Sequence, residues 1–118
     1  MSNRKASLIV KDILRCIEHL ETYTSNLSLE KFSADFMVVE ACLYNIQIIG
    51  EAANSLSSEV KQKSPAVPWS LIKGMRNRLI HEYFGTDVEV VWNVIQNDLP
   101  DLKLNLTELH SELLSQGL

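Results

Sequence analysis

One short segment of the chain, Gly74-Met-Arg-Asn-Arg-Leu-Ile-His-Glu-Tyr-Phe-Gly85, concentrates side chains that can transfer protons or bind anions. An imidazole that titrates near neutral pH can exchange a proton with a hydroxyl group. A guanidinium can donate two parallel hydrogen bonds to phosphate oxygens. His81 and Arg76 supply these two groups, and Tyr83 adds a phenol. Together these residue types suit chemistry on a phosphodiester bond.

Helical spacing divides the polar side chains of this segment between two faces. Residues four apart share a face, which places Asn77 with His81, and residues seven apart also share one, which places Arg76 with Tyr83. The second pair lies about 140° around the helix axis from His81. Arg76 could reach His81 along its own stem, or the two could meet across a twofold axis between two chains. We favour the twofold arrangement.

Five basic side chains lie in residues 61–78, a stretch without one acidic residue: Lys61, Lys63, Lys73, Arg76 and Arg78. The whole chain carries a net charge of −4, which argues against binding of nucleic acid by bulk positive charge but not by a local basic patch. A basic run of this size is also typical of a solvated face. An arginine and a histidine at this spacing are likewise common on ordinary helix surfaces.

Apolar residues recur at the three- and four-residue spacing of helices with one buried face. The first helix is predicted from Leu8 to about Tyr23, and its buried positions are Ile9, Ile13, Cys16, Ile17, Leu20 and Tyr23. A short helical turn follows at Leu29–Phe32. A helix of about twenty residues then begins after a cap at Ser33 or Asp35. Its inward positions are Phe36, Val39, Cys42, Leu43, Ile46, Ile49, Ala53 and Leu56.

Gly50 lies inside that second helix, where glycine is unfavourable, and we interpret it as a close helix crossing. Beyond a weakly patterned stretch, Pro65 and Pro68 favour a new helix that begins near Trp69 and ends near Gly85.

A further helix is predicted over Val88–Asn97, capped by Thr86 or Asp87. Pro100 marks either a bend or a new start into Asp101–Leu114. The chain, residues 1–118, is therefore predicted to be one domain, an all-α bundle of four to five helices.

The two cysteines, Cys16 and Cys42, have apolar neighbours and no spacing typical of a zinc site, and we expect buried free thiols and no bound metal. The N-terminal segment has only three consecutive apolar residues before Lys11, too few for a signal peptide. No stretch approaches a membrane span by inspection. We therefore expect a cytoplasmic protein without a membrane partner.

The arrangement Arg76-x-x-x-x-His81-x-Tyr83 resembles the signature of the HEPN superfamily, in the form with a trailing tyrosine that marks its HepT-like toxin branch. The resemblance extends over nearly the whole chain, in the order and approximate spacing of that branch. The other segments that carry it are Ile48-Ile-Gly-Glu-Ala-Ala53 with Leu56-Ser57, Pro68-Trp69, Gly74-Met-Arg-Asn77, His81-Glu-Tyr-Phe-Gly85, Val91-Trp92 and Asp98-Leu-Pro100.

This resemblance implies an all-helical homodimer that acts as a metal-independent endoribonuclease, with no cofactor. It implies the toxin of a type VII-like toxin–antitoxin pair, whose antitoxin is a minimal nucleotidyltransferase. Arg76 and His81 are then the catalytic residues, and Asn77 supports them. The antitoxin is expected to silence the toxin by transferring AMP to Tyr83.

Each chain offers one histidine in the cluster, whereas cleavage through the RNA's own 2′-hydroxyl needs both a base and an acid. A dimer supplies two. Lys73 and Arg78 are candidates to contact RNA, and Glu51 either orients a residue of the cluster or faces solvent. Trp69 and Trp92 are more typical of core anchors than of base-stacking platforms.

The alternative is a non-catalytic helical subunit that binds a minimal nucleotidyltransferase or a nucleotide through the same polar cluster. The presence of Arg76, His81 and Tyr83 together favours the enzyme over this alternative.

Overall fold

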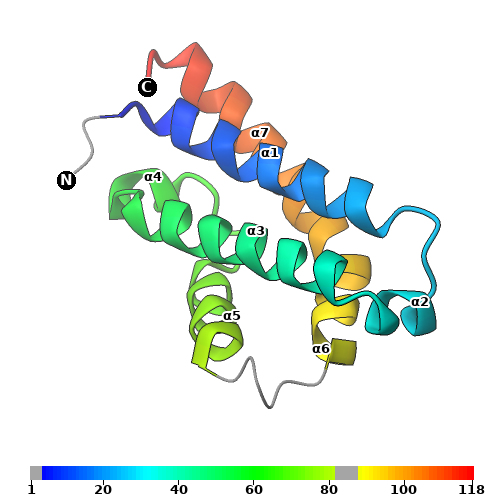
Figure 1. The fold of residues 1–118 in the computed structure, drawn as a ribbon. Helices are drawn as coiled ribbons and strands as arrows, with labels where there is room; N and C mark the ends of the chain where they lie inside the picture. Colours follow the sequence, from blue (N-terminus) through cyan, green and yellow to red (C-terminus); the bar gives the residue numbers. More distant parts are fainter. Residues whose placement is uncertain (1–3, 82–87) are drawn as a thin grey trace.

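The computed structural model describes the backbone of residues 4–81 and 88–118, and this part of the chain is helical, with no strand (Figure 1). Four long helices carry the fold: α1 (Ala6–Thr24), α3 (Phe36–Ser55), α5 (Trp69–His81) and α7 (Leu99–Ser115). Shorter elements connect them: α2 (Leu29–Ala34), α4 (Ser58–Gln62), α6 (Val88–Asn93) and the π-helical segment η2 (Val94–Asp98). The all-α class is confirmed.

The core lies where α1 meets α3 and α7, with α3 packed on α5 from the other side (Figure 1). Full burial of one such aliphatic side chain contributes about 1.5–3 kcal/mol. The largest fully buried side chains include Ile13, Ile17, Leu20, Ile46, Ile49, Leu106, Leu109 and Leu113. Because these come from α1, α3 and α7, the packing of these three helices stabilises the frame on which α5 is mounted.

Side-chain caps decide where the short and long helices begin. Asp35 caps α3, because its Oδ1 accepts a hydrogen bond from the Val38 amide at 3.3 Å, so Asp35 rather than Ser33 is the N-cap. Ser57 accepts a hydrogen bond from the Val60 amide at 3.2 Å and starts α4. The sequence pattern did not predict α4, since a helix of five residues is too short to show an apolar period.

Two residues predicted to lie inward are exposed. Phe36 is 69% exposed, because it is the first residue of α3 and Phe32 of α2 already fills the core at this end, 5.1 Å from the Trp92 ring. Tyr23 is 38% exposed, and its ring stacks on His19 with the ring centroids 6.0 Å apart. A phenol that stays at the surface keeps its hydroxyl in water, which offsets the lost burial.

The helix predicted over Val88–Asn97 is interrupted. The α-helical hydrogen bonding of α6 ends at Asn93, η2 continues as a π-helix, and α7 begins at Leu99 with Pro100 in its first turn. Asn93, Asp98 and Leu99 all keep right-handed helical backbone angles, so Pro100 stands in the first turn of α7 directly after the π-helical turn, where its missing amide donor is tolerated. The expected end of α5 near Gly85 and the expected caps Thr86 and Asp87 lie outside the described residues.

By length and composition α3 could cross a membrane, since an 18-residue stretch of it has a mean hydropathy of 1.3. The expectation that no segment approaches a membrane span is wrong by this measure. The helix nevertheless packs against both α1 and α5 and buries Val39, Cys42 and Ile49 between them. Core helices of helical bundles have the same length and composition, so α3 is weak evidence for a membrane span.

Both cysteines are buried free thiols, as expected. Burial raises the pKa of the Cys42 thiol to about 11, and burial followed by the nearby Asp12 carboxylate raises the pKa of the Cys16 thiol. Both sulfurs are thus protonated at neutral pH. A thiol in this state is a poor nucleophile and metal ligand, so the two residues serve packing.

Candidate active site

The first turn of α5 is anchored by Trp69. Its indole Nε1–H donates to the carbonyl oxygens of Lys61 and Ser64, each at 3.2 Å, and the Lys61 ammonium lies 6.0 Å from the ring centroid. The ring is half-buried against the core, and Trp92 packs there as well. Both tryptophans therefore act as core anchors, as predicted, and Trp69 fixes the start of the helix that carries the polar cluster.

The middle of α5 is held against α3. Ile72 is buried, and Gly50 is buried on α3, the helix on which α5 packs. A glycine at a helix crossing lets two backbones approach closely, which is consistent with the role expected for Gly50. The position of α5 is thus set by Trp69 at its start and by Ile72 along its length.

The two residues with the strongest chemical signal, Arg76 and His81, lie on this one helix, whose described backbone ends at His81. Their helical spacing is therefore as predicted, and Asn77 and His81 share a face. The side chain of Asn77 is half-buried and that of Lys73 is exposed. The side chains of Arg76, Arg78 and His81, and all of Tyr83, lie outside the described part of the structure, so their contacts stay predictions.

Glu51 lies on α3, the neighbour of α5. Its carboxylate is exposed, and Oε1 accepts a hydrogen bond from Gln47 Nε2 at 3.2 Å, one turn earlier on the same helix. This contact accounts for one oxygen of the carboxylate. The orienting role toward the cluster on α5 stays a prediction.

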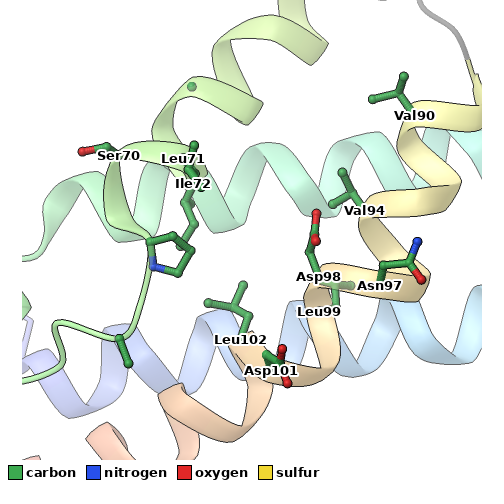
Figure 2. Close-up of a pocket in the computed structure, with 13 residues that line it drawn as sticks. Ser70, Leu71, Ile72, Val90, Val94, Asn97, Asp98, Leu99, Asp101 and Leu102 are labelled. Carbon is green, nitrogen blue, oxygen red and sulfur yellow. The ribbon is translucent and has the colours of Figure 1, made fainter.

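A cavity of about 580 Å³ lies beside α5, between its N-terminal half and the wall formed by α6, η2 and α7 (Figure 2). Its buried floor is apolar and includes Ile72, Leu99 and Leu102. Its exposed polar rim is formed by Ser70, Asn97, Asp98 and Asp101. Apolar surface with a few polar side chains at the edge is the usual composition of a ligand site. The sequence pattern does not predict this cleft. Its two walls are about 25 residues apart in the chain, and one of them includes η2, which the pattern does not predict either.

The face of α5 that lines this cleft continues along the helix to position 81. Leu71 and Gly74 line the cleft three residues apart, and residues 78 and 81 continue the same helical spacing. By helix geometry positions 78 and 81 lie within about 40° of Gly74, whereas position 76 lies about 160° away. The cleft and the backbone position of His81 therefore belong to one face of α5, and Arg76 belongs to another.

Comparison with known proteins matches residues 13–109 to a family model described as ribonuclease HepT-like. A probable ribonuclease HepT of Thermococcus cleftensis is 37% identical over 94 residues, which cover 80% of this chain and 86% of that protein. A protein of Caldanaerobacter subterraneus named as a candidate RNase is 36% identical over 100 residues, covering 85% and 89% of the two chains. A third, from Methanocaldococcus jannaschii and also named as a candidate RNase, is 33% identical over 103 residues, covering 87% and 94%. No solved structure matches the chain significantly.

Proposed function

The chain belongs to the HepT-like ribonuclease family, and we propose that it is a metal-independent endoribonuclease, the toxin of a type VII-like toxin–antitoxin pair. The observation that carries the proposal is that the family match, residues 13–109, contains the whole arrangement Arg76-x-x-x-x-His81-x-Tyr83. The relatives named as ribonucleases support RNA as the substrate.

In the proposed reaction the 2′-hydroxyl of the RNA attacks the adjacent phosphorus, and the 5′-oxygen of the next nucleotide leaves. His81 of one chain takes the proton of the 2′-hydroxyl, and His81 of the second chain gives a proton to the leaving oxygen. The Arg76 guanidinium stabilises the additional negative charge on the phosphorus-centred transition state. The products are a 2′,3′-cyclic phosphate and a 5′-hydroxyl end.

A homodimer is part of this proposal, because two imidazoles must act at one phosphate. Large apolar side chains that are exposed in the single chain support an interface. Met37 and Tyr44 are seven residues apart on one face of α3 and are 68% and 65% exposed. Lys73, which is exposed on the same helix as Arg76, is proposed to contact RNA phosphates, and Arg78 is proposed for the same role.

The remaining partner in the proposal is a minimal nucleotidyltransferase that acts as antitoxin and modifies Tyr83. Both proteins are proposed to act in the cytoplasm, where RNA and ATP are available and where the free thiols Cys16 and Cys42 stay reduced. Asn77 and Glu51 are proposed to support the catalytic pair from α5 and α3.

Cleavage is expected to continue at the wild-type rate in excess EDTA, because the RNA supplies its own nucleophile and two imidazoles supply the proton transfers. Purified protein is incubated with end-labelled RNA, and the fragment ends are identified by mass and by resistance to phosphatase. Fragments with 2′,3′-cyclic phosphate ends are expected. A requirement for added Mg²⁺, or fragments with 3′-hydroxyl ends, would sink this mechanism.

A mixture of His81→Ala and Arg76→Ala chains is expected to cleave RNA at a rate that differs from that of either parent. The heterodimer keeps one intact imidazole and one intact guanidinium in the shared site, whereas each parent lacks both copies of one group. Tagged chains are co-expressed, heterodimers are purified by two affinity steps, and their rates are compared with those of the parents. A stable monomer that cleaves RNA as fast as the wild type would contradict the shared site.

A further inference from the structure

The cleft beside α5 has the size and chemistry of a site for a flat, partly polar ligand. Its volume of about 580 Å³ falls within the range of small-molecule sites. Ile72, Leu99 and Leu102 are buried under its floor, while Asn97 and Asp98 stand at one edge (Figure 2). An unstacked nucleobase is bound in the same way, with its faces on apolar or aromatic side chains and its edge on polar groups.

Two residues of α5 indicate that something outside the chain approaches this face. Leu71 lines the cleft and is 71% exposed, although it is a large apolar side chain. Gly74 also lines the cleft, and a Cβ built there would meet no heavy atom within 4 Å. Glycine weakens a helix relative to alanine, and no neighbour within the described residues requires its small size. A ligand that packs on Leu71 and comes close to the helix backbone explains both residues.

The opposite wall of the cleft contains the π-helical segment. Val94, Asn97 and Asp98 of η2 all line the cavity. A π-turn within helical structure changes the direction of the following side chains and is frequent at functional sites. Asp98 keeps helical backbone angles where η2 passes into α7, and its side chain makes no capping hydrogen bond to α7. The Asp98 carboxylate therefore does not stabilise the N-terminal end of α7.

The charged side chains among the described lining residues of the cleft all lie on one wall. Asp98 and Asp101 give the η2–α7 wall two carboxylates, which repel a phosphate and accept hydrogen bonds only. Adenine, cytosine and guanine each offer an amino group to such an acceptor, whereas uracil presents two carbonyl oxygens and a single N–H. The α5 residues that line the cleft, Ser70, Leu71, Ile72 and Gly74, carry no charge, so the repulsion of a phosphate is confined to the opposite wall.

We propose that this cleft binds the nucleobase next to the scissile phosphate, with Asn97 contacting the base edge and the Asp98 carboxylate selecting bases that carry an amino group. The inference rests on the proposed ribonuclease function and assigns it a base preference. It depends on the face shared by Leu71, Gly74 and position 81, since the backbone of His81 lies about 10 Å along α5 from Gly74 on that face. Uracil is the base that the site discriminates against.

The test measures single-turnover cleavage of short RNAs that differ only in the base beside the cleaved bond. Wild-type protein is expected to cleave uracil at that position at least about tenfold more slowly than the best base, a difference typical of one hydrogen-bonded contact. Asp98→Asn is expected to reduce this preference to about twofold or less, because an amide can donate to a uracil carbonyl. Glu108→Gln removes the same charge from an exposed site on α7 outside the cleft and should keep the wild-type preference.

Gly74→Leu tests the cleft by filling it. The new side chain enters open space, so the helix content and thermal midpoint should not fall, and the rate on every RNA is expected to drop at least about tenfold. Gly74→Ala adds a single methyl group and should have a smaller effect. Glu108→Leu places the same side chain outside the cleft and should keep the wild-type rate.

Three outcomes separate this inference from the proposal on which it rests. If wild-type protein cleaves no RNA, the ribonuclease proposal fails and the base site fails with it. If wild-type protein cleaves RNA but Asp98→Asn and Gly74→Leu keep the wild-type rates and preference, only the base site is overturned. If Gly74→Leu abolishes dimer formation while the base preference is unchanged, the cleft is a protein-docking surface and the base site is again wrong.

Discussion

Replacing His81 with alanine is expected to lower the rate of RNA cleavage by about 100- to 10,000-fold, the usual contribution of a positioned general acid or base. The loss is expected at the upper end of this range, because in a homodimer the substitution removes both the base and the acid. Arg76→Ala is expected to lower the rate by about 100- to 1,000-fold, the usual cost of one lost electrostatic contact to the transition state. Both variants should also lose toxicity when they are expressed in cells.

Conservative variants separate the chemistry from the charge. Arg76→Lys keeps the positive charge but loses the planar fork that binds two phosphate oxygens, so its rate should remain well below that of the wild type. His110→Ala removes an imidazole from α7, outside the proposed site, and should cleave RNA at the wild-type rate. Single-turnover cleavage of one labelled RNA by all four variants provides the comparison.

Folding must be preserved for these losses to report on catalysis. The described core is formed mainly by α1, α3 and α7, and the two proposed catalytic residues lie in the second half of α5, beyond the buried Ile72. The helical circular dichroism and the mass of the dimer are therefore expected to match the wild type. If both variants unfold or fall apart into monomers, the role of the cluster is structural rather than chemical.

The parts of the fold that the sequence predicted are those where a local signal and the packing agree. The apolar period of α1 and α3, the cap at Asp35, which was one of two candidates, and the start of α5 at Trp69 all follow from residues within one or two helical turns. Each of these features depends on neighbours in the chain, so a reading of spacing and caps can identify it.

The parts that the sequence did not predict depend on distant residues. Phe36 has the right spacing for the core of α3, yet Phe32 from the preceding helix occupies that space. The π-helical turn at Val94–Asp98 has no local signature that a period of 3.6 residues reveals. The cleft in turn forms only because η2 and α5, which are separated in the sequence, face each other in the fold. A base site at Asn97 and Asp98 therefore could not be inferred before the fold was known.

For the candidate site, the residue types and their spacing follow from the sequence. The fold adds which face of α5 borders the cleft. Arg76 and His81 were expected on different faces of one helix, and α5 as described extends through both positions. The added information is that the face of position 81 also carries Leu71 and Gly74 and borders the cleft. If one face receives the base, the role proposed for Arg76, whose backbone position lies on another face, fits a site shared with a second chain.

Transfer of AMP to Tyr83 is expected to abolish RNA cleavage. In the proposed step the phenol oxygen attacks the α-phosphorus of ATP, pyrophosphate leaves and the phenol loses its proton. Tyr83 lies outside the described residues, but it follows Arg76 by seven positions, the spacing of one helical face. A nucleotide attached there occupies the space that the RNA phosphate needs. Its phosphodiester also pairs with Arg76 and repels the RNA backbone, so the steric and the electrostatic effects act in the same direction.

The measurement combines intact mass with activity. Incubation with the cognate nucleotidyltransferase and ATP should add the mass of AMP to wild-type protein and should leave the mass of Tyr83→Phe unchanged. Unmodified Tyr83→Phe should retain part of the cleavage rate, because only a hydroxyl is lost. Tyr23 and Tyr44 are both exposed, so they are accessible competitors, and Tyr23→Phe and Tyr44→Phe should be modified and silenced like the wild type. Modification that persists in Tyr83→Phe, or that maps to Tyr23, Tyr44 or a serine, would show that silencing does not act through Tyr83. That result would leave the ribonuclease proposal intact, since the proposed reaction uses only Arg76 and His81. The antitoxin would then have to inhibit cleavage from a surface other than the proposed catalytic site.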